Sequence, residues 1–133
     1  MMENESKSSN VGLQRPPEPV NAPYLEFDLC SQIELLRGEE RYQHGHNSKT
    51  LAKYADFRLV LTVIKAGTRI HRHTAAGRIS VQTVAGHIRM YAGEKLLDLP
   101  AGRLLVIDRE ISHDVQAVDD SAFLLTIAWP ESR

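Results

Sequence analysis

The fold of this chain is decided by two glycine-bounded stretches, GTRIHRHTAAGRISVQTVAG at residues 67–86 and GRLLVIDREISHDVQA at residues 102–117. Each stretch places histidine between well-spaced glycines within a run of short, strand-forming segments. The first contains His71 and His73, and the second contains His113. These are the histidines of the chain that a fold can gather at one point, which predicts a small β-barrel with a pocket.

β-Structure is favoured from about residue 49 to the end of the chain. Residues 57–64 are rich in Leu, Val, Thr and Ile, which fit a pleated, half-buried surface. Turn sequences then separate further short strands, expected near residues 69–74, 79–85, 87–91, 95–99, 103–108, 113–118 and 122–129. No long helix separates them, so the spacing predicts an all-β sandwich or barrel rather than a parallel βαβ fold.

The residues before the strands divide into an arm and a helix. Residues 1–23 are polar and proline-rich, and they cannot bury enough apolar surface to offset their ordering entropy. We therefore predict a flexible arm, ordered only against a partner subunit. The remaining residues, 24–133, are expected to form a single domain.

A short helix is predicted over residues 32–40. Ser31 followed by Glu34 matches a capping box, and Gly38 favours the end of the helix. Leu35 and Leu36 are expected to face inward.

The composition narrows the class of protein. The chain has 133 residues and a formal net charge of −1, which argues against a nucleic-acid-binding protein. No apolar run approaches the roughly 20 residues that span a bilayer, and the N-terminus lacks the apolar core of a signal peptide. Cys30 is the only cysteine, so no internal disulfide can form, and we expect a cytoplasmic location.

Residues 57–129 resemble the cupin superfamily, whose double-sheet jelly roll is one arrangement of antiparallel sheets. Its first motif is a glycine, two histidines, a glutamate and a closing glycine. Gly67, His73 and Gly86 match that spacing, and Gly102 and His113 match the spacing of the second motif. The resemblance implies an all-β, cupin-type jelly-roll β-barrel.

Several motif positions hold other residues here. At the strict spacing, Ala75 replaces the second histidine and Ile79 replaces the glutamate. In the second motif, Ala117 replaces the asparagine, Asp108 the proline and Glu110 the glycine. This alignment leaves two of the four usual ligands and favours a cupin scaffold that has lost its metal.

A second interpretation keeps a metal site. His71 and His73 are two residues apart, so on a regular strand both lie on one face. With His113 they form a three-histidine centre for a divalent ion such as Fe, Ni, Zn or Mn, with positions left open for water, oxygen or substrate. A shifted alignment makes His71 and His73 the family's histidine pair. It then places Arg78, which cannot ligate a metal, at the glutamate position.

The register of the strand at residues 79–85 decides what else lines the pocket. Arg78 and Gln82, facing inward, would supply a cation and an amide for a carboxylate or phosphate ligand. Burying Arg78 without an anion is costly, so the apolar set is expected inward instead: Ile79, Val81 and Thr83.

The region before the strands holds a weaker candidate. His44-Gly45-His46 has the composition of a metal clip, but its polar surroundings favour a plain loop. A mildly basic stretch crosses the same region, as a solvated face or the border of the pocket mouth: Arg41, Lys49, Lys53 and Arg58.

Two classes of function follow, and whether the protein is an enzyme stays open between them. The resemblance implies a metal-dependent enzyme, such as a dioxygenase or isomerase acting on a small organic molecule. The alternative is a metal-free module that senses or binds a small molecule at the barrel mouth, or that assembles with other chains. We expect a homodimer that binds a small-molecule ligand and neither nucleic acid nor membrane. A structural alternative also stands, in which His71 and His73 are surface residues and His113 is hydrogen-bonded at a turn beside Asp114.

Overall fold

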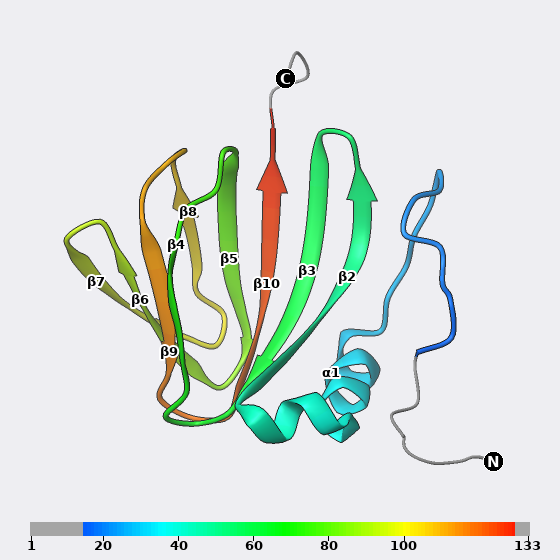
Figure 1. Cartoon of the computed structure of the whole chain (residues 1–133), viewed down its shortest axis with the longest axis horizontal. Coiled ribbons are helices and arrows are strands. Elements are labelled where there is room, and N and C mark those ends of the chain that lie inside the picture. The colour runs from blue at the N-terminus through cyan, green and yellow to red at the C-terminus, as the bar shows by residue number, and fades with distance from the viewer. Residues whose placement is uncertain (1–14, 130–133) are drawn as a thin grey trace.

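The computed structural model describes residues 15–129, apart from the side chains of Arg72 and His73. Within this range the chain forms two antiparallel sheets preceded by a helix, as predicted (Figure 1). The elements are α1 (Leu29–Gly38), η1 (Glu40–His44), β2 (His46–Tyr54), β3 (Phe57–Ile64), β4 (Arg69–His73), β5 (Arg78–Ala85), β6 (His87–Ala92), β7 (Lys95–Pro100), β8 (Leu104–Ile107), β9 (His113–Ala117) and β10 (Ser121–Ala128).

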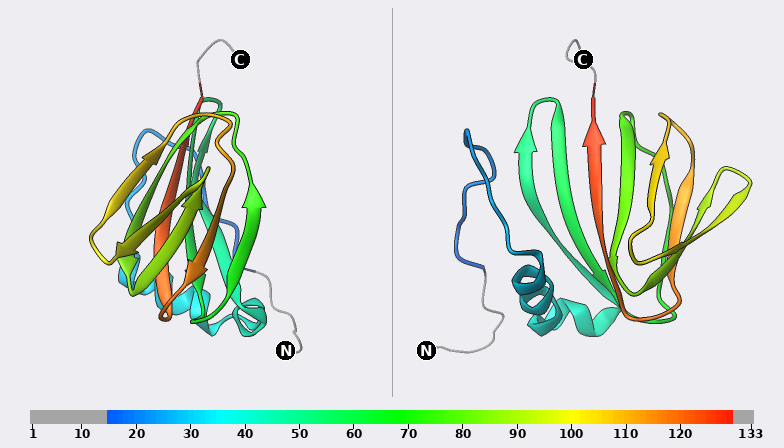
Figure 2. Two further views of the ribbon diagram at one scale, coloured as in Figure 1. Left: turned by 90° about the vertical axis from the view of Figure 1, so that its left-hand side faces the viewer. Right: turned by 180° about the vertical axis from the view of Figure 1, so that it is seen from behind.

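The two sheets face each other across a first apolar core. One has the strand order β2-β3-β10-β5-β8 and the other the order β4-β9-β6-β7 (Figure 2). Alternate residues of both sheets point between them, because side chains on a strand alternate between its faces. This first core consists of Ile64, Ile79, Val81, Ile88, Met90, Leu99, Ile107, Val115, Ala117 and Phe123. The observed architecture confirms the predicted all-β fold with a short N-terminal helix.

A second apolar core lies on the outer side of the five-stranded sheet, under α1. Ile33 and Leu36 of the helix pack there against β2 and β3, the strands that supply Leu51, Leu61 and Val63. Full burial of such an aliphatic side chain stabilises the fold by about 1.5–3 kcal/mol.

The helix begins three residues earlier than the sequence predicted. Asp28, not Ser31, is the N-cap, and its Oδ1 accepts a hydrogen bond from the Ser31 N–H at 3.3 Å. Aspartate and serine are both good N-cap residues, because each side chain can accept a hydrogen bond from a backbone N–H, so the sequence alone does not choose between Asp28 and Ser31. With this start, Leu36 faces the second core, whereas Leu35 is 49% exposed and its predicted inward position is wrong. Gly38 is the last helical residue, as expected.

Residues 15–23 lie along β2 of their own chain and form neither helix nor strand. The Lys53 N–H donates to the Val20 carbonyl at 2.7 Å, and the Tyr54 hydroxyl donates to the Ala22 carbonyl at 2.7 Å. This part of the predicted arm is therefore ordered against its own sheet rather than only against a partner. Residues 1–14 of the arm lie outside the described residues.

Strand β2 begins at His46, ahead of the predicted onset of β-structure. The predicted loop His44-Gly45-His46 is only partly a loop. His44 ends η1, Gly45 connects the two elements, and His46 is the exposed first residue of β2. The sequence of β2 shows no clear alternation of polar and apolar residues. It is an edge strand, and its buried residues are covered by α1 and by residues 15–23.

Candidate functional site

His113 begins β9 and is the centre of the candidate site. It is 4% exposed and shares the inner face of its sheet with Val115 and Ala117, both members of the first core. Its Nδ1 lies 3.0 Å from the carbonyl oxygen of Ile111. A carbonyl only accepts, so Nδ1 is the donor in this contact.

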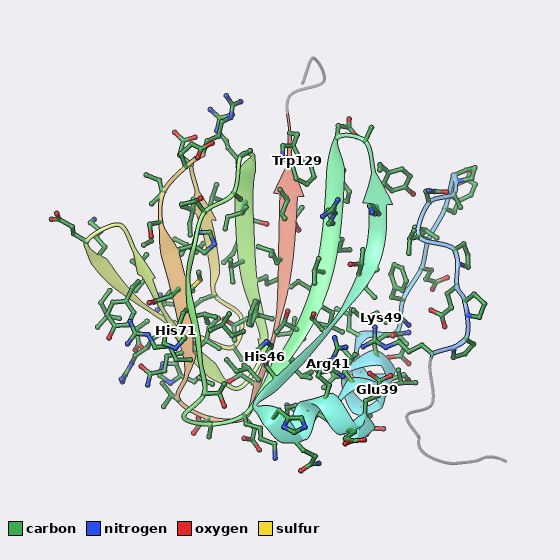
Figure 3. The ribbon with its side chains drawn as sticks, in the orientation of Figure 1. Glu39, Arg41, His46, Lys49, His71 and Trp129 are labelled. Atoms are coloured by element: carbon green, nitrogen blue, oxygen red, sulfur yellow. The ribbon has the colours of Figure 1, made fainter. Side chains whose placement is uncertain are left out.

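A β-bulge in β4 decides which histidines share a face. Ile70 pairs with Val115 and His73 pairs with His113, so β4 takes three steps where β9 takes two. The extra residue interrupts the alternation of side chains. Ile70 packs against the first core, and His71 is exposed (Figure 3). The prediction that His71 joins His113 on the inner face is therefore wrong, because two-residue spacing implies a shared face only in a regular strand.

The backbone of His73 lies directly opposite that of His113. Residues directly opposite in an antiparallel pair belong to the same face of the sheet. The register thus brings these two positions together, while the side chain of His73 lies outside the described residues.

The inner face beside His113 carries apolar side chains at positions where a metal would need ligands. Ile79 and Ala117 belong to the first core, and Ala75 packs against it. Ala75 and Ile79 stand where the strict cupin spacing places a histidine and a glutamate ligand, and Ala117 stands at the asparagine position. Among the described side chains, no group of three or more His, Cys, Asp or Glu is arranged to hold a metal ion. This donor set does not fit a metal centre with three or four protein ligands.

Asp114 lies behind His113, on the outer face of the same sheet. Its side chain is 6% exposed, and its Oδ2 accepts from Arg69 Nη2 at 2.7 Å. The hydrogen bond and the charge of Asp114 raise the pKa of Arg69, whose guanidinium lies 4.9 Å from the centre of the Tyr91 ring. Adjacent strand residues point to opposite faces, so Asp114 pairs with Arg69 and is not an acid–base partner of His113.

Arg78 and Gln82 lie on the exposed outer face of β5. Arg78 forms an exposed ion pair with Asp108, with 3.1 Å between Nε and Oδ1. The alternative in which Arg78 and Gln82 line an interior pocket is therefore wrong. The guanidinium keeps its hydration on this face, and the expected set is buried in its place: Ile79, Val81 and Thr83.

A second candidate lies outside the barrel, where the sequence marked only a basic stretch. A cavity of about 270 Å³ is bounded by β2 and the segment that precedes α1, and Lys49 forms part of its wall. The Lys49 side chain is only 11% exposed. Figure 3 shows it beside α1, on the opposite side of the molecule from His71. No local pattern marks this cavity, because its walls meet only on folding: Glu18 and Lys49 are 31 residues apart.

No helix in the described range is both long and apolar enough to cross a membrane. The cytoplasmic location stays a prediction from the single cysteine.

Neither the family models nor the curated proteins include a match to this sequence. Solved structures do match it. A conserved protein of unknown function from Streptococcus pyogenes aligns with a TM-score of 0.63 and 25% identity, over 67% of this chain and 78% of the other. A cupin superfamily protein from Desulfitobacterium hafniense aligns with a TM-score of 0.62 and 14% identity, over 64% and 78%.

A further likeness extends over more of the chain. A cupin 2 conserved barrel domain protein from Leptotrichia buccalis aligns with a TM-score of 0.66 and 21% identity, over 77% of this chain and 47% of the other. At such low sequence identities, structural similarity shows that the proteins share the arrangement of their strands. Together with the two-sheet topology and the matching glycine and histidine spacing, it identifies the protein as a small domain of the cupin fold.

Proposed function

We propose that the protein binds a small, largely apolar molecule inside its barrel and holds it through His113, without a resident catalytic metal. The observation that carries this proposal is the burial of His113 on the inner face, beside the apolar first core. A histidine costs more to bury than an apolar side chain, so its retention there favours a role in binding.

The orientation of His113 suggests the chemistry of the ligand. Its Nδ1 contact with the Ile111 carbonyl fixes the ring on the inner face. A single imidazole beside apolar walls suits a ligand that offers one hydroxyl or N–H group and is otherwise apolar. Phenol is the simplest probe of this class.

The donor set favours this binding role over the metal-dependent enzyme. Protein ligands of a catalytic ion usually number three, and carbon side chains stand at the two positions that would complete the set: Ala75 and Ile79. His71 is exposed beside the bulge in β4, so its imidazole is not available as a further ligand on the inner face. An ion held by His73 and His113 alone is the competing outcome of the test.

The test compares two matched histidine substitutions. His113→Phe keeps an aromatic ring and removes the imidazole nitrogens, and His71→Phe makes the same change at an exposed position of the neighbouring strand. Each protein is titrated with phenol and followed by backbone amide NMR. We expect binding to the parent and to His71→Phe, with shifts in β4 and β9, and binding at least about tenfold weaker in His113→Phe.

The metal content of the same samples decides between the two functions. Elemental analysis after incubation with Zn²⁺, Ni²⁺, Mn²⁺ or Fe²⁺ should find no near-stoichiometric ion. Metal retained by the parent and lost in His113→Phe would restore the metal-dependent interpretation. Equal affinity of the parent and His113→Phe for phenol, or no affinity in either, would contradict the proposal.

Assembly into a homodimer is a second candidate, and one edge of the molecule favours it. Strand β8 ends the five-stranded sheet, and its outward side chains, Leu104 and Val106, are 62% and 65% exposed. At the opposite edge, residues 15–23 lie along β2. An uncovered apolar edge pairs readily with another chain. We propose that two copies would join through β8.

A further inference from the structure

The cavity outside the barrel has an apolar wall and a charged end. Its volume is about 270 Å³, just below the size range of pockets for drug-sized ligands. Val20, Phe27 and Leu51 supply apolar surface, and Leu51 belongs to the second core. Arg15, Glu18 and Lys49 supply charge. A molecule with one charged group and a small apolar body matches this division.

Lys49 is the cation best placed to hold such a charged group. Its ammonium group lies 2.7 Å from Glu18 Oε1 and 3.0 Å from Gln32 Oε1, while its side chain is 11% exposed. An ammonium has three N–H donors, so these two acceptors leave capacity for another. A largely buried ammonium is costly without an anion beside it.

Arg15 is held by more contacts than Lys49, and its carboxylate partner is less exposed than Glu18. Its guanidinium donates to Glu39 in a bidentate arrangement, with contacts of 2.8, 2.9 and 3.1 Å. The Arg15 hydrogen bond lowers the pKa of Glu39, which is also bonded to Asn47. These partners fix Arg15 as part of the wall, so Lys49 is left to recognise a ligand.

Glu18 is the group that a ligand would replace. Its side chain is 49% exposed and lies on residues 15–23, which form no regular structure. A ligand carboxylate can take the place of Glu18 because it leaves the Lys49 ammonium with an anion beside it. On leaving Lys49, the Glu18 carboxylate recovers its hydration.

We propose that this cavity binds a small organic carboxylate, with Lys49 holding the carboxylate in place of Glu18 and the apolar body lying against Val20, Phe27 and Leu51. The site is separate from His113 and does not rest on the function proposed above. The carboxylate of Glu18 thus occupies the site when no ligand is bound.

Benzoate and its neutral analogue benzyl alcohol test the site in the full chain by backbone amide NMR. We expect benzoate to shift signals of β2 and of residues 15–27, and benzyl alcohol to bind at least about tenfold more weakly. Lys49→Met should weaken benzoate binding by a similar factor, while Lys49→Arg retains it. Lys53→Met, at an exposed position of the same strand, should leave the affinity unchanged.

Glu18→Gln distinguishes the proposed site from a non-specific cationic site, because only the proposed site should bind benzoate more tightly in this variant. Removing the competing carboxylate should tighten benzoate binding by about fivefold. Equal binding of benzoate and benzyl alcohol to the parent would overturn the proposal, as would an unchanged affinity in folded Lys49→Met or in Glu18→Gln. His113→Phe should bind benzoate like the parent, so failure at this cavity and failure inside the barrel are told apart.

Discussion

Glu39 links the N-terminal segment to the end of the helix. Arg15 and Asn47 both donate to its carboxylate, with the Asn47 contact at 2.8 Å. The Arg15 hydrogen bond is the main cause that lowers the pKa of Glu39, against a smaller opposing effect of burial. A carboxyl whose pKa is lower in the folded chain stabilises the fold above its ordinary pKa. That contribution is lost as the pH falls through the folded value.

Glu39→Gln should therefore change both the stability and its dependence on pH. We expect the variant to be about 1–3 kcal/mol less stable than the parent at neutral pH, because a charged hydrogen-bond partner is removed. Between about pH 6 and about pH 3, the parent should lose stability more steeply than the variant. Urea denaturation at several pH values measures both, and Glu40→Gln at the exposed neighbouring position is the control. Parallel pH profiles of parent and variant would contradict the assignment.

Individual residues also show how far alternation along a strand can predict a site. Alternation and the cost of burying a cation placed Ile79 inward and Arg78 outward, because β5 is regular across these residues. The same reasoning failed for His71, because the bulge in β4 arises from its pairing with β9. Pairing between strands distant in sequence leaves no local pattern, so the site could be predicted only as far as His113 and the position of His73.

At the scale of the elements, α1 packs on the sheet through one narrow apolar face. Leu36 is fully buried in the second core, while its neighbour Leu35 is 49% exposed. Leu36→Ala should destabilise the protein by about 2–5 kcal/mol, the usual cost of removing a buried leucine side chain. Leu35→Ala should change the free energy of unfolding by less than about 0.5 kcal/mol. Chemical denaturation of the two variants compares them, and similar losses would show that the helix packs differently.

The turn between β5 and β6 depends on Gly86. Its φ is 81°, and an added Cβ would meet the Asp120 carbonyl oxygen and Ser121 Oγ. Gly67 has nearly the same φ, 84°, with nothing within 4 Å of an added Cβ. Gly67→Ala should cost about 1–2 kcal/mol for the left-handed backbone alone. Gly86→Ala should cost at least about 1–3 kcal/mol more, because backbone must also move. Thermal unfolding compares them, and equal melting temperatures would exclude the clash.

Element boundaries were predictable where the local pattern alone decides them. Phe57–Ile64 was predicted to the residue, because it is rich in β-branched residues and its second half contributes to both apolar cores. The start of α1 was missed, because Asp28 and Ser31 are both good caps and tertiary packing selects between them. Strand β2 was predicted only in part, since its burial is supplied by α1 and residues 15–23.

At the scale of the whole molecule, the five-stranded sheet has one covered edge and one uncovered edge. Residues 15–23 lie beside β2, whereas among the described residues no strand pairs with the outer side of β8. Opposed residues of an antiparallel pair share a face, so two copies of β8 can pair about Leu105. Leu104 of one copy then lies opposite the partner's Val106, which extends the sheet and covers apolar surface on both copies.

Val106→Lys tests this arrangement, because it places a charge beside an apolar side chain at the proposed interface. Analytical ultracentrifugation should show a dimer for the parent and a monomer for Val106→Lys, with the dissociation constant raised at least about tenfold. The same substitution at Val118, which is 37% exposed but lies outside β8, should leave the dimer intact and control for added charge. A parent that stays monomeric at high concentration would rule out assembly through this edge. Dimers that persist in Val106→Lys would place the interface elsewhere on the barrel.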